Sequence, residues 1–155
     1  MGIEAVRVFL EARAPDIPII EQASSTATVL EAAATLGVLP GQIAKTLSLR
    51  VGDAVVLVVA AGDYRLDNRK VKDALGSRPR MLSSEEVEQL TGHPVGGVCP
   101  FGLPAPLPIY CDISLRQFDS VYPAAGSRTA SVRITLERLA DLVGATWADL
   151  CSPPL

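Results

Sequence analysis

Residues 43–61 read IAKTLSLRVGDAVVLVVAA, a long uninterrupted stretch with the pattern of β-structure. From Lys45 to Val51 polar and apolar side chains alternate, which is typical of a strand with one buried face. Gly52-Asp53 supplies the residues of a tight hairpin turn, and the apolar run Ala54–Ala60 has the composition of a central strand. The stretch therefore predicts a hairpin in the middle of a sheet.

Helices and shorter strands are predicted on both sides of this hairpin. Apolar spacing predicts a helix over residues 3–13, and capping residues with glycine stops predict helices over 28–37, 67–76, 83–92 and 136–143. Short strands are expected at 17–20, 80–82, 107–111, 120–122 and 130–134. Residues 94–108 contain five prolines and three glycines, which predicts an ordered loop.

The order of these elements favours an α+β fold. Helices interrupt strand pairs instead of alternating strictly with strands, which argues against a doubly wound parallel sheet. We expect a mixed, largely antiparallel sheet, or a partly closed barrel, flanked by helices. The length of 155 residues and the 48% hydrophobic and 20% charged composition are those of one globular domain, here residues 1–155.

Composition also restricts location and chemistry. The apolar run Ala54–Ala61 is far shorter than the ~18 residues that cross a bilayer, and no secretory signal is visible. Three distant cysteines suit a reducing compartment, so a cytoplasmic protein without membrane association is expected. With one histidine and no paired Cys/His spacing, neither a metal nor an organic cofactor is expected. Any histidine-dependent triad would depend entirely on His93.

Charge is unevenly distributed along the chain. The formal net charge of −3 argues against broad DNA or RNA binding. Residues 63–80, however, carry a net charge of +3, from six basic and three acidic side chains. This segment is either a helix face whose charges pair with one another or a positive strip for a partner that presents phosphates.

Three segments resemble the YbaK / prolyl-tRNA-synthetase-associated editing-domain family, in their order and their separations. They are Ile43–Leu47 with Lys45, Thr91–Gly102 with the G-x-x-x-P loop Gly96–Pro100, and Ala124–Ser127. The segment Arg65-x-Asp67-x-x-Lys70 extends the resemblance over nearly the whole chain, as in a free-standing member.

The resemblance implies a YbaK-like fold and a trans-acting deacylase. Such domains hydrolyse the ester between a wrong amino acid, such as Cys, Ala or another small residue, and the terminal adenosine of a tRNA, most often proline tRNA. The implied partners are the acceptor end of the mischarged tRNA and prolyl-tRNA synthetase. Editing is needed because a binding pocket discriminates near-isosteres by only about 1–3 kcal/mol.

The resemblance also implies the site. It gives Lys45 the catalytic role, and it gives substrate binding to Thr46, Gly96, Gly97, Val98, Cys99, Pro100, Ala125, Gly126 and Ser127. Gly96 and Gly97 lack Cβ atoms, so their N–H groups can approach an ester carbonyl or a ribose, and Pro100 stiffens the loop. No base or nucleophile is evident, which agrees with a reaction assisted by the ribose hydroxyl or the cysteine thiol of the substrate.

Other interpretations stay open. The Gly/Pro segment by itself is also typical of a structural turn, and Lys45 of a solvated lysine. The chain could be a non-catalytic module that binds aminoacyl-tRNA or a synthetase, or a small-molecule hydrolase that uses Cys99 with His93. Ser127 and Val132 depart from the family pattern near the amino-acid pocket, which leaves open the residue removed. We interpret Asp112 as a turn or cap residue.

Overall fold

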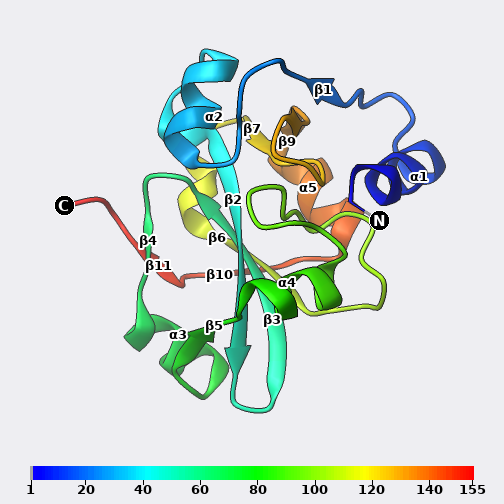
Figure 1. The fold of residues 1–155 in the computed structure, drawn as a ribbon. Coiled ribbons are helices and arrows are strands. Elements are labelled where there is room, and N and C mark those ends of the chain that lie inside the picture. The colour runs from blue at the N-terminus through cyan, green and yellow to red at the C-terminus, as the bar shows by residue number, and fades with distance from the viewer. Residues whose placement is uncertain (1) are drawn as a thin grey trace.

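The predicted hairpin forms the centre of the sheet in the computed structural model, which describes residues 2–155 (Figure 1). Strands β2 (Ile43–Val51) and β3 (Ala54–Ala61) pair antiparallel from Ala44 opposite Ala61 to Val51 opposite Ala54. The sheet continues in the order β10-β6-β3-β2-β7-β9, and β5 is a further partner of β2. The added strands are β5 (Pro79–Met81), β6 (Ile109–Asp112), β7 (Ser120–Pro123), β9 (Ile134–Thr135) and β10 (Thr146–Ala148).

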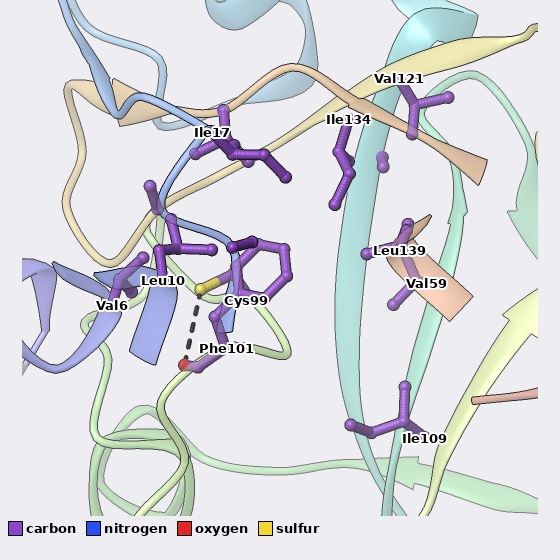
Figure 2. Close-up of a cluster of buried hydrophobic side chains, with 14 of the residues drawn as sticks. Val6, Leu10, Ile17, Val59, Cys99, Phe101, Ile109, Val121, Ile134 and Leu139 are labelled. Atoms are coloured by element: carbon purple, nitrogen blue, oxygen red, sulfur yellow. Dashed lines mark hydrogen bonds between the residues drawn. The ribbon is translucent and has the colours of Figure 1, made fainter. Parts of the chain in front are cut away.

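Both faces of this sheet are covered, which explains the unbroken apolar run of β3. Leu57 and Val59 point into a core shared with α1 (Ile3–Arg13) and α5 (Leu136–Val143), part of which Figure 2 shows. Val58 and Ala60 point into a second core with Val71 of α3 (Asn68–Leu75). Alternate side chains of a strand enter opposite faces, so only a strand buried on both sides is apolar at every position. The predicted α+β class with a mixed sheet is confirmed, and the sheet curls into a half-barrel, as the expectation of a partly closed barrel allowed.

The predicted helix ends are confirmed by their caps. The Thr28 hydroxyl accepts from the Glu31 N–H before α2 (Val29–Leu36), and the Asp67 carboxylate accepts from two N–H groups of α3. Ser83 and Glu86 form a full capping box at α4 (Ser84–Thr91). Left-handed glycines end these helices and α5, at Gly37, Gly76, Gly92 and Gly144.

Several short elements differ from the prediction. The strand expected at 17–20 is β1 (Ile20–Glu21), and the strand expected at 130–134 is split into β8 (Ala130–Ser131) and β9. The sequence analysis missed β4 (Arg65–Leu66), β10, β11 (Cys151–Ser152) and the 3-10 turn η2 (Ile113–Gln117). These elements are two to five residues long, and tertiary pairing fixes strands this short more than local propensity does. No helix within residues 2–155 has the length and apolar character to cross a bilayer.

A buried carboxylate joins the strand β6 to Leu150 and Cys151, at the start of β11. Asp112 is 1% exposed, and its Oδ2 accepts from the N–H of Ser114 at 2.9 Å. Its Oδ1 accepts from the N–H groups of Leu150 and Cys151 at 2.7 and 3.0 Å. The expected cap role is confirmed at η2, and the two further bonds make Asp112 a tie between segments almost 40 residues apart.

Candidate active site

The two edges of β2 differ in their hydrogen bonding. One edge pairs with β3 along almost its whole length. The other edge pairs with β7 at Ile43 and Ala44 and with β5 from Leu49 to Val51. Between these contacts the outer edge of residues 45–47 has no strand partner within the described chain.

The backbone of Thr46 faces this open part of the edge. The Ser48 carbonyl accepts from the Leu82 N–H at 3.2 Å, so it points away from β3. Backbone groups of alternate residues in a strand point to the same side, and Thr46 lies two residues before Ser48. Its N–H and C=O groups are therefore offered at the outer edge.

A pocket of about 290 Å³ lies against the open edge. Six parts of the chain line it: the start of α2, the strand β2, the β5–α4 connection, the end of β7, the strand β8 at Ser131 and the loop before Pro100. Its floor at β2 includes Lys45, Thr46 and Ser48, and the loop contributes Val95, Gly96 and Val98. The pocket thus brings together the first two segments of the family resemblance and Ala124, the first residue of the third.

The ammonium of Lys45 is held at the end of β3. It donates to the carbonyl of Gly62 at 3.3 Å and to the carbonyl of Tyr64. Partial burial lowers the pKa of Lys45, and the nearby carboxylate of Asp63 acts in the opposite direction. Lys45 is among the residues that line the pocket, but its amine is bound to the carbonyls of Gly62 and Tyr64, which do not line it. A ligand must therefore draw the amine away from these neutral acceptors.

The loop wall depends on close approach of two glycine segments. The N–H of Gly126 donates to the carbonyl of Gly97 at 2.9 Å. A Cβ at Gly97 would lie 2.6 Å from the backbone nitrogen of Ser127, which leaves no room for any side chain. Gly96 has a φ of +94°, a conformation that L side chains rarely adopt. The third family segment therefore supports the loop from behind.

The sequence-predicted site residues fall into two groups. Lys45, Thr46, Gly96 and Val98 line the pocket. The lining does not include Gly97, Cys99, Pro100, Ala125, Gly126 or Ser127. Ala125 and Cys99 are fully buried in the first core.

Cys99 is enclosed and unreactive in this setting. Figure 2 shows its sulfur among apolar side chains, beside the carbonyl of Phe101. Its Sγ lies 3.5 Å from Nε2 of His93, and burial raises the pKa of Cys99 to about 12. Because the thiolate is the nucleophilic form, this environment does not support the thiol-hydrolase interpretation.

One hydroxyl in the pocket lacks a partner. Oγ1 of Thr46 is buried and makes no hydrogen bond with the chain. Buried polar atoms are nearly always paired, so an unpaired one at a pocket wall is available to a ligand. Thr46 thus combines a free hydroxyl with free backbone groups at the open edge.

The titratable side chains that line the pocket are Lys45 and Tyr122. Among the described residues no histidine, cysteine or carboxylate lines it, and no group of three or more possible metal ligands occurs. The arrangement can orient a ligand and donate hydrogen bonds, but it offers no nucleophile–base pair.

Several lining residues were not found from the sequence. They come from the start of α2, from the β5–α4 connection and from β7: Thr26, Ala27, Val29, Met81, Leu82, Ser84 and Tyr122. Thr28 was singled out, although only as a helix cap. No spacing pattern links these segments, because tertiary contacts alone bring them to β2.

Comparison with known sequences defines the class of this domain. The sequence profile of the "Aminoacyl-tRNA editing domain" matches residues 23–142, and the chain therefore belongs to this family. The predicted family relationship is thereby confirmed.

Individual relatives agree with this assignment. The chain is 42% identical to "Uncharacterized protein YwhH" of Bacillus subtilis (strain 168), with 97% of this chain and 98% of that protein covered. It is 31% identical to a "Proline--tRNA ligase" of Bacillus licheniformis over 81% of this chain but only 22% of the ligase. A crystal structure described provisionally as a trans-editing enzyme for prolyl tRNA synthetase has a TM-score of 0.90 and 36% identity, with 97% and 96% of the two chains covered.

Proposed function

We propose that this protein hydrolyses mischarged aminoacyl-tRNA in trans, acting on proline tRNA that carries Cys, Ala or another small residue. Membership of the editing family and the similarity to part of proline–tRNA ligases support this proposal. The observation that carries it is the pocket at the open edge of β2, which is lined by Lys45 and Thr46 of the strand and by Gly96 and Val98 of the loop.

The pocket residues hold the acylated terminal adenosine. The N–H groups of Gly96, Val98 and Thr46 donate to the ester carbonyl or to the ribose, and the nearby Pro100 keeps the loop rigid. The N–H of Gly97 does not take part, because it donates to the carbonyl of Pro94 at 2.9 Å. The Lys45 ammonium binds an anionic oxygen of the terminal nucleotide or orients the carbonyl. A charged phosphate oxygen is a stronger acceptor than the neutral carbonyls of Gly62 and Tyr64, so the amine exchanges partners on binding.

The substrate itself replaces the missing base. The oxygen of a water molecule bonds to the ester carbonyl carbon, and the bond from that carbon to the ribose oxygen breaks. One water proton passes to the departing ribose oxygen, which leaves a free amino acid and a tRNA with an intact 3′ end. The 2′-hydroxyl of the terminal ribose, or the thiol of a cysteinyl substrate, positions the water because no lining side chain can act as a histidine or carboxylate base.

A panel of proline tRNAs charged with Cys, Ala, Ser, Thr or Pro tests this function. We expect rapid release of at least one wrong amino acid and slow release of proline. A set of tRNAs that all stay charged would overturn the proposal. A substrate with a 2′-deoxy terminal ribose tests the assistance, because normal turnover of that substrate would exclude a role for the hydroxyl.

The variant Lys45→Ala tests the catalytic residue. We expect kcat/KM to fall by about 100-fold or more, as for loss of one transition-state donor, with the fold retained in circular dichroism. Arg133→Ala is the matched control, because Arg133 is exposed and no ion pair involves it in the described chain. Full activity of Lys45→Ala would remove Lys45 from the mechanism.

A non-catalytic module is the second candidate, and the absence of a lining base is the observation that favours it. Such a module would bind mischarged tRNA tightly and slow its spontaneous hydrolysis. The same panel distinguishes the two candidates, because a deacylase increases the rate at which the amino acid is released and a protective module decreases it.

A further inference from the structure

Five basic side chains between residues 63 and 80 have no partner in the described chain. Lys70 pairs with Asp149 at 2.9 Å and also donates to the carbonyl of Cys151. The other five are exposed, and no ion pair, side-chain hydrogen bond or cation–π contact within residues 2–155 involves them. We call these five the basic strip: Arg65, Arg69, Lys72, Arg78 and Arg80.

The acidic residues of the same segment do not neutralise the strip. Asp67 caps α3 through the N–H groups of Arg69 and Lys70, and it accepts from the Ser152 hydroxyl at 2.6 Å. Asp63 and Asp73 make no ion pair with the strip in the described chain. A helix face whose charges pair with one another, one of the two sequence interpretations, is therefore not what the structure shows.

Basic residues elsewhere are mostly engaged. Arg7 pairs with two glutamates, Arg50 with Glu86, and Arg138 with Asp16. The guanidinium groups of Arg13 and Arg116 lie over aromatic rings, and Arg128 donates to the carbonyl of Val95. Unpartnered positive charge is thus concentrated on one segment of a chain whose remaining residues carry a net charge of −6.

The basic strip ends at the pocket. Arg69 and Lys72 are three residues apart on α3 and share an exposed helix face. Arg80 is followed directly by Met81 and Leu82, which line the pocket, and it lies opposite Arg50 in the β2–β5 register. Arg50 is two residues, or about 7 Å along β2, from the pocket residue Ser48. In Figure 1 the segment runs from β4 through α3 and back through β5 to α4.

We infer that the basic strip is the docking surface for the phosphate backbone of the RNA helix whose 3′ end enters the pocket. This inference rests on the proposed function, which places an acylated RNA end in that pocket. Unpaired arginines and lysines bind phosphates with release of counterions and without reading sequence. Glu85 and Glu88 lie on α4, which follows Met81 and Leu82 in the chain. Their negative charges repel phosphates, so we expect the RNA to lie on the α3 side of the pocket.

The test measures binding without chemistry. The probe is an uncharged RNA hairpin of acceptor-stem length with a single-stranded 3′ CCA end, titrated by fluorescence anisotropy between 50 and 200 mM KCl. We expect the triple variant R69Q/K72Q/R78Q to bind about 10- to 100-fold more weakly at the lowest salt. The slope of log affinity against log salt should fall by about 2, since each phosphate contact contributes roughly 0.7–0.9. R133Q is the control with an exposed charge outside the strip.

The outcomes are separable from those of the deacylation assay. An unchanged affinity and salt slope in the triple variant would overturn the strip as an RNA surface, and so would a wild-type protein that does not bind the hairpin at 50 mM KCl. A variant that loses hairpin binding supports the strip even if the wild-type protein releases no amino acid, in which case only the proposed function fails. Thermal unfolding of all variants, with R78Q/R80Q as a second strip variant, separates lost binding from lost folding.

Discussion

The two edges of β2 have different roles, although both consist of the same backbone N–H and C=O groups. Along the inner edge, pairing with β3 continues without interruption from the turn to Ala44. Along the outer edge, β7 and β5 pair only with the two ends of the strand. The inner edge therefore contributes to stability, and the open part of the outer edge forms the floor of the pocket.

This difference shows how the open edge of a sheet can form one wall of a binding site. Unpaired backbone groups at a strand edge are costly when buried, so they need either a neighbouring strand or a ligand. The gap between β7 and β5 leaves the backbone of Thr46 without a strand partner, and the hydroxyl of Thr46 is unpaired as well. We expect substitutions on the inner side to change stability and substitutions at the gap to change ligand handling.

The largest effect is expected for Leu57→Ala. Leu57 is fully buried in β3 opposite Ser48, and its truncation leaves a cavity in the first core. The free energy of unfolding should fall by about 2–5 kcal/mol, measured by urea denaturation. A loss below about 1 kcal/mol would show that this side of β2 is not the rigid side.

A smaller effect of a different kind is expected for Thr46→Val. Because Oγ1 of Thr46 has no partner in the chain, its removal should leave the free energy of unfolding unchanged or raise it by up to about 1 kcal/mol. Deacylation should nevertheless fall by about 10-fold in kcat/KM, the value of one hydrogen bond to the substrate. Thr26→Val is the matched control, since the Thr26 hydroxyl donates to the carbonyl of Arg128 and its loss should cost about 1 kcal/mol of stability.

The smallest effect is expected for the pH dependence of stability that His93 causes. His93, the one histidine of the chain, is fully buried, and its Nε2 lies 2.7 Å from the carbonyl of Phe101. Burial lowers the pKa of His93, so below pH 6.5 the unfolded chain binds a proton that the folded protein still excludes. Stability should therefore decrease as the pH falls from 6.5 toward the native pKa, by at most about 1.4 kcal/mol per pH unit.

The variant His93→Gln should lack this pH component while its amide still donates to Phe101. Urea denaturation at several pH values between 7 and 5.5 measures the slopes of both proteins. Equal slopes would show that the ionisation of His93 does not contribute to the pH dependence of the free energy of unfolding in this range.

The elements that were predictable from the sequence carry their own signals. The hairpin depends on alternation and on its turn residues, and α1 depends on apolar spacing. The other four helices have Ser, Thr or Asp at the N-cap and glycine at the C-cap. The split between β8 and β9 was not predictable. Val132 is fully buried between the two strands, so the apolar pattern continues where the pairing changes partner from β1 to β7.

The candidate site was only partly predictable, for a related reason. Lys45, Thr46, Gly96 and Val98 belong to the family motifs, and the structure brings them to one pocket. Gly97, Gly126 and Ser127 belong to the same motifs, but their glycine content serves the close packing of two backbones behind the wall. A sequence pattern does not distinguish a glycine whose backbone approaches a ligand from a glycine whose backbone packs against another segment of the same chain.

The tie at Asp112 has a consequence for biosynthesis. Two of the three N–H groups that satisfy this enclosed carboxylate belong to Leu150 and Cys151. A nascent chain that has left the ribosome only as far as α5 would offer the Asp112 side chain the N–H of Ser114 alone, one of its three donors. The full hydrogen bonding of Asp112 is therefore expected only after Leu150 and Cys151 have left the ribosome.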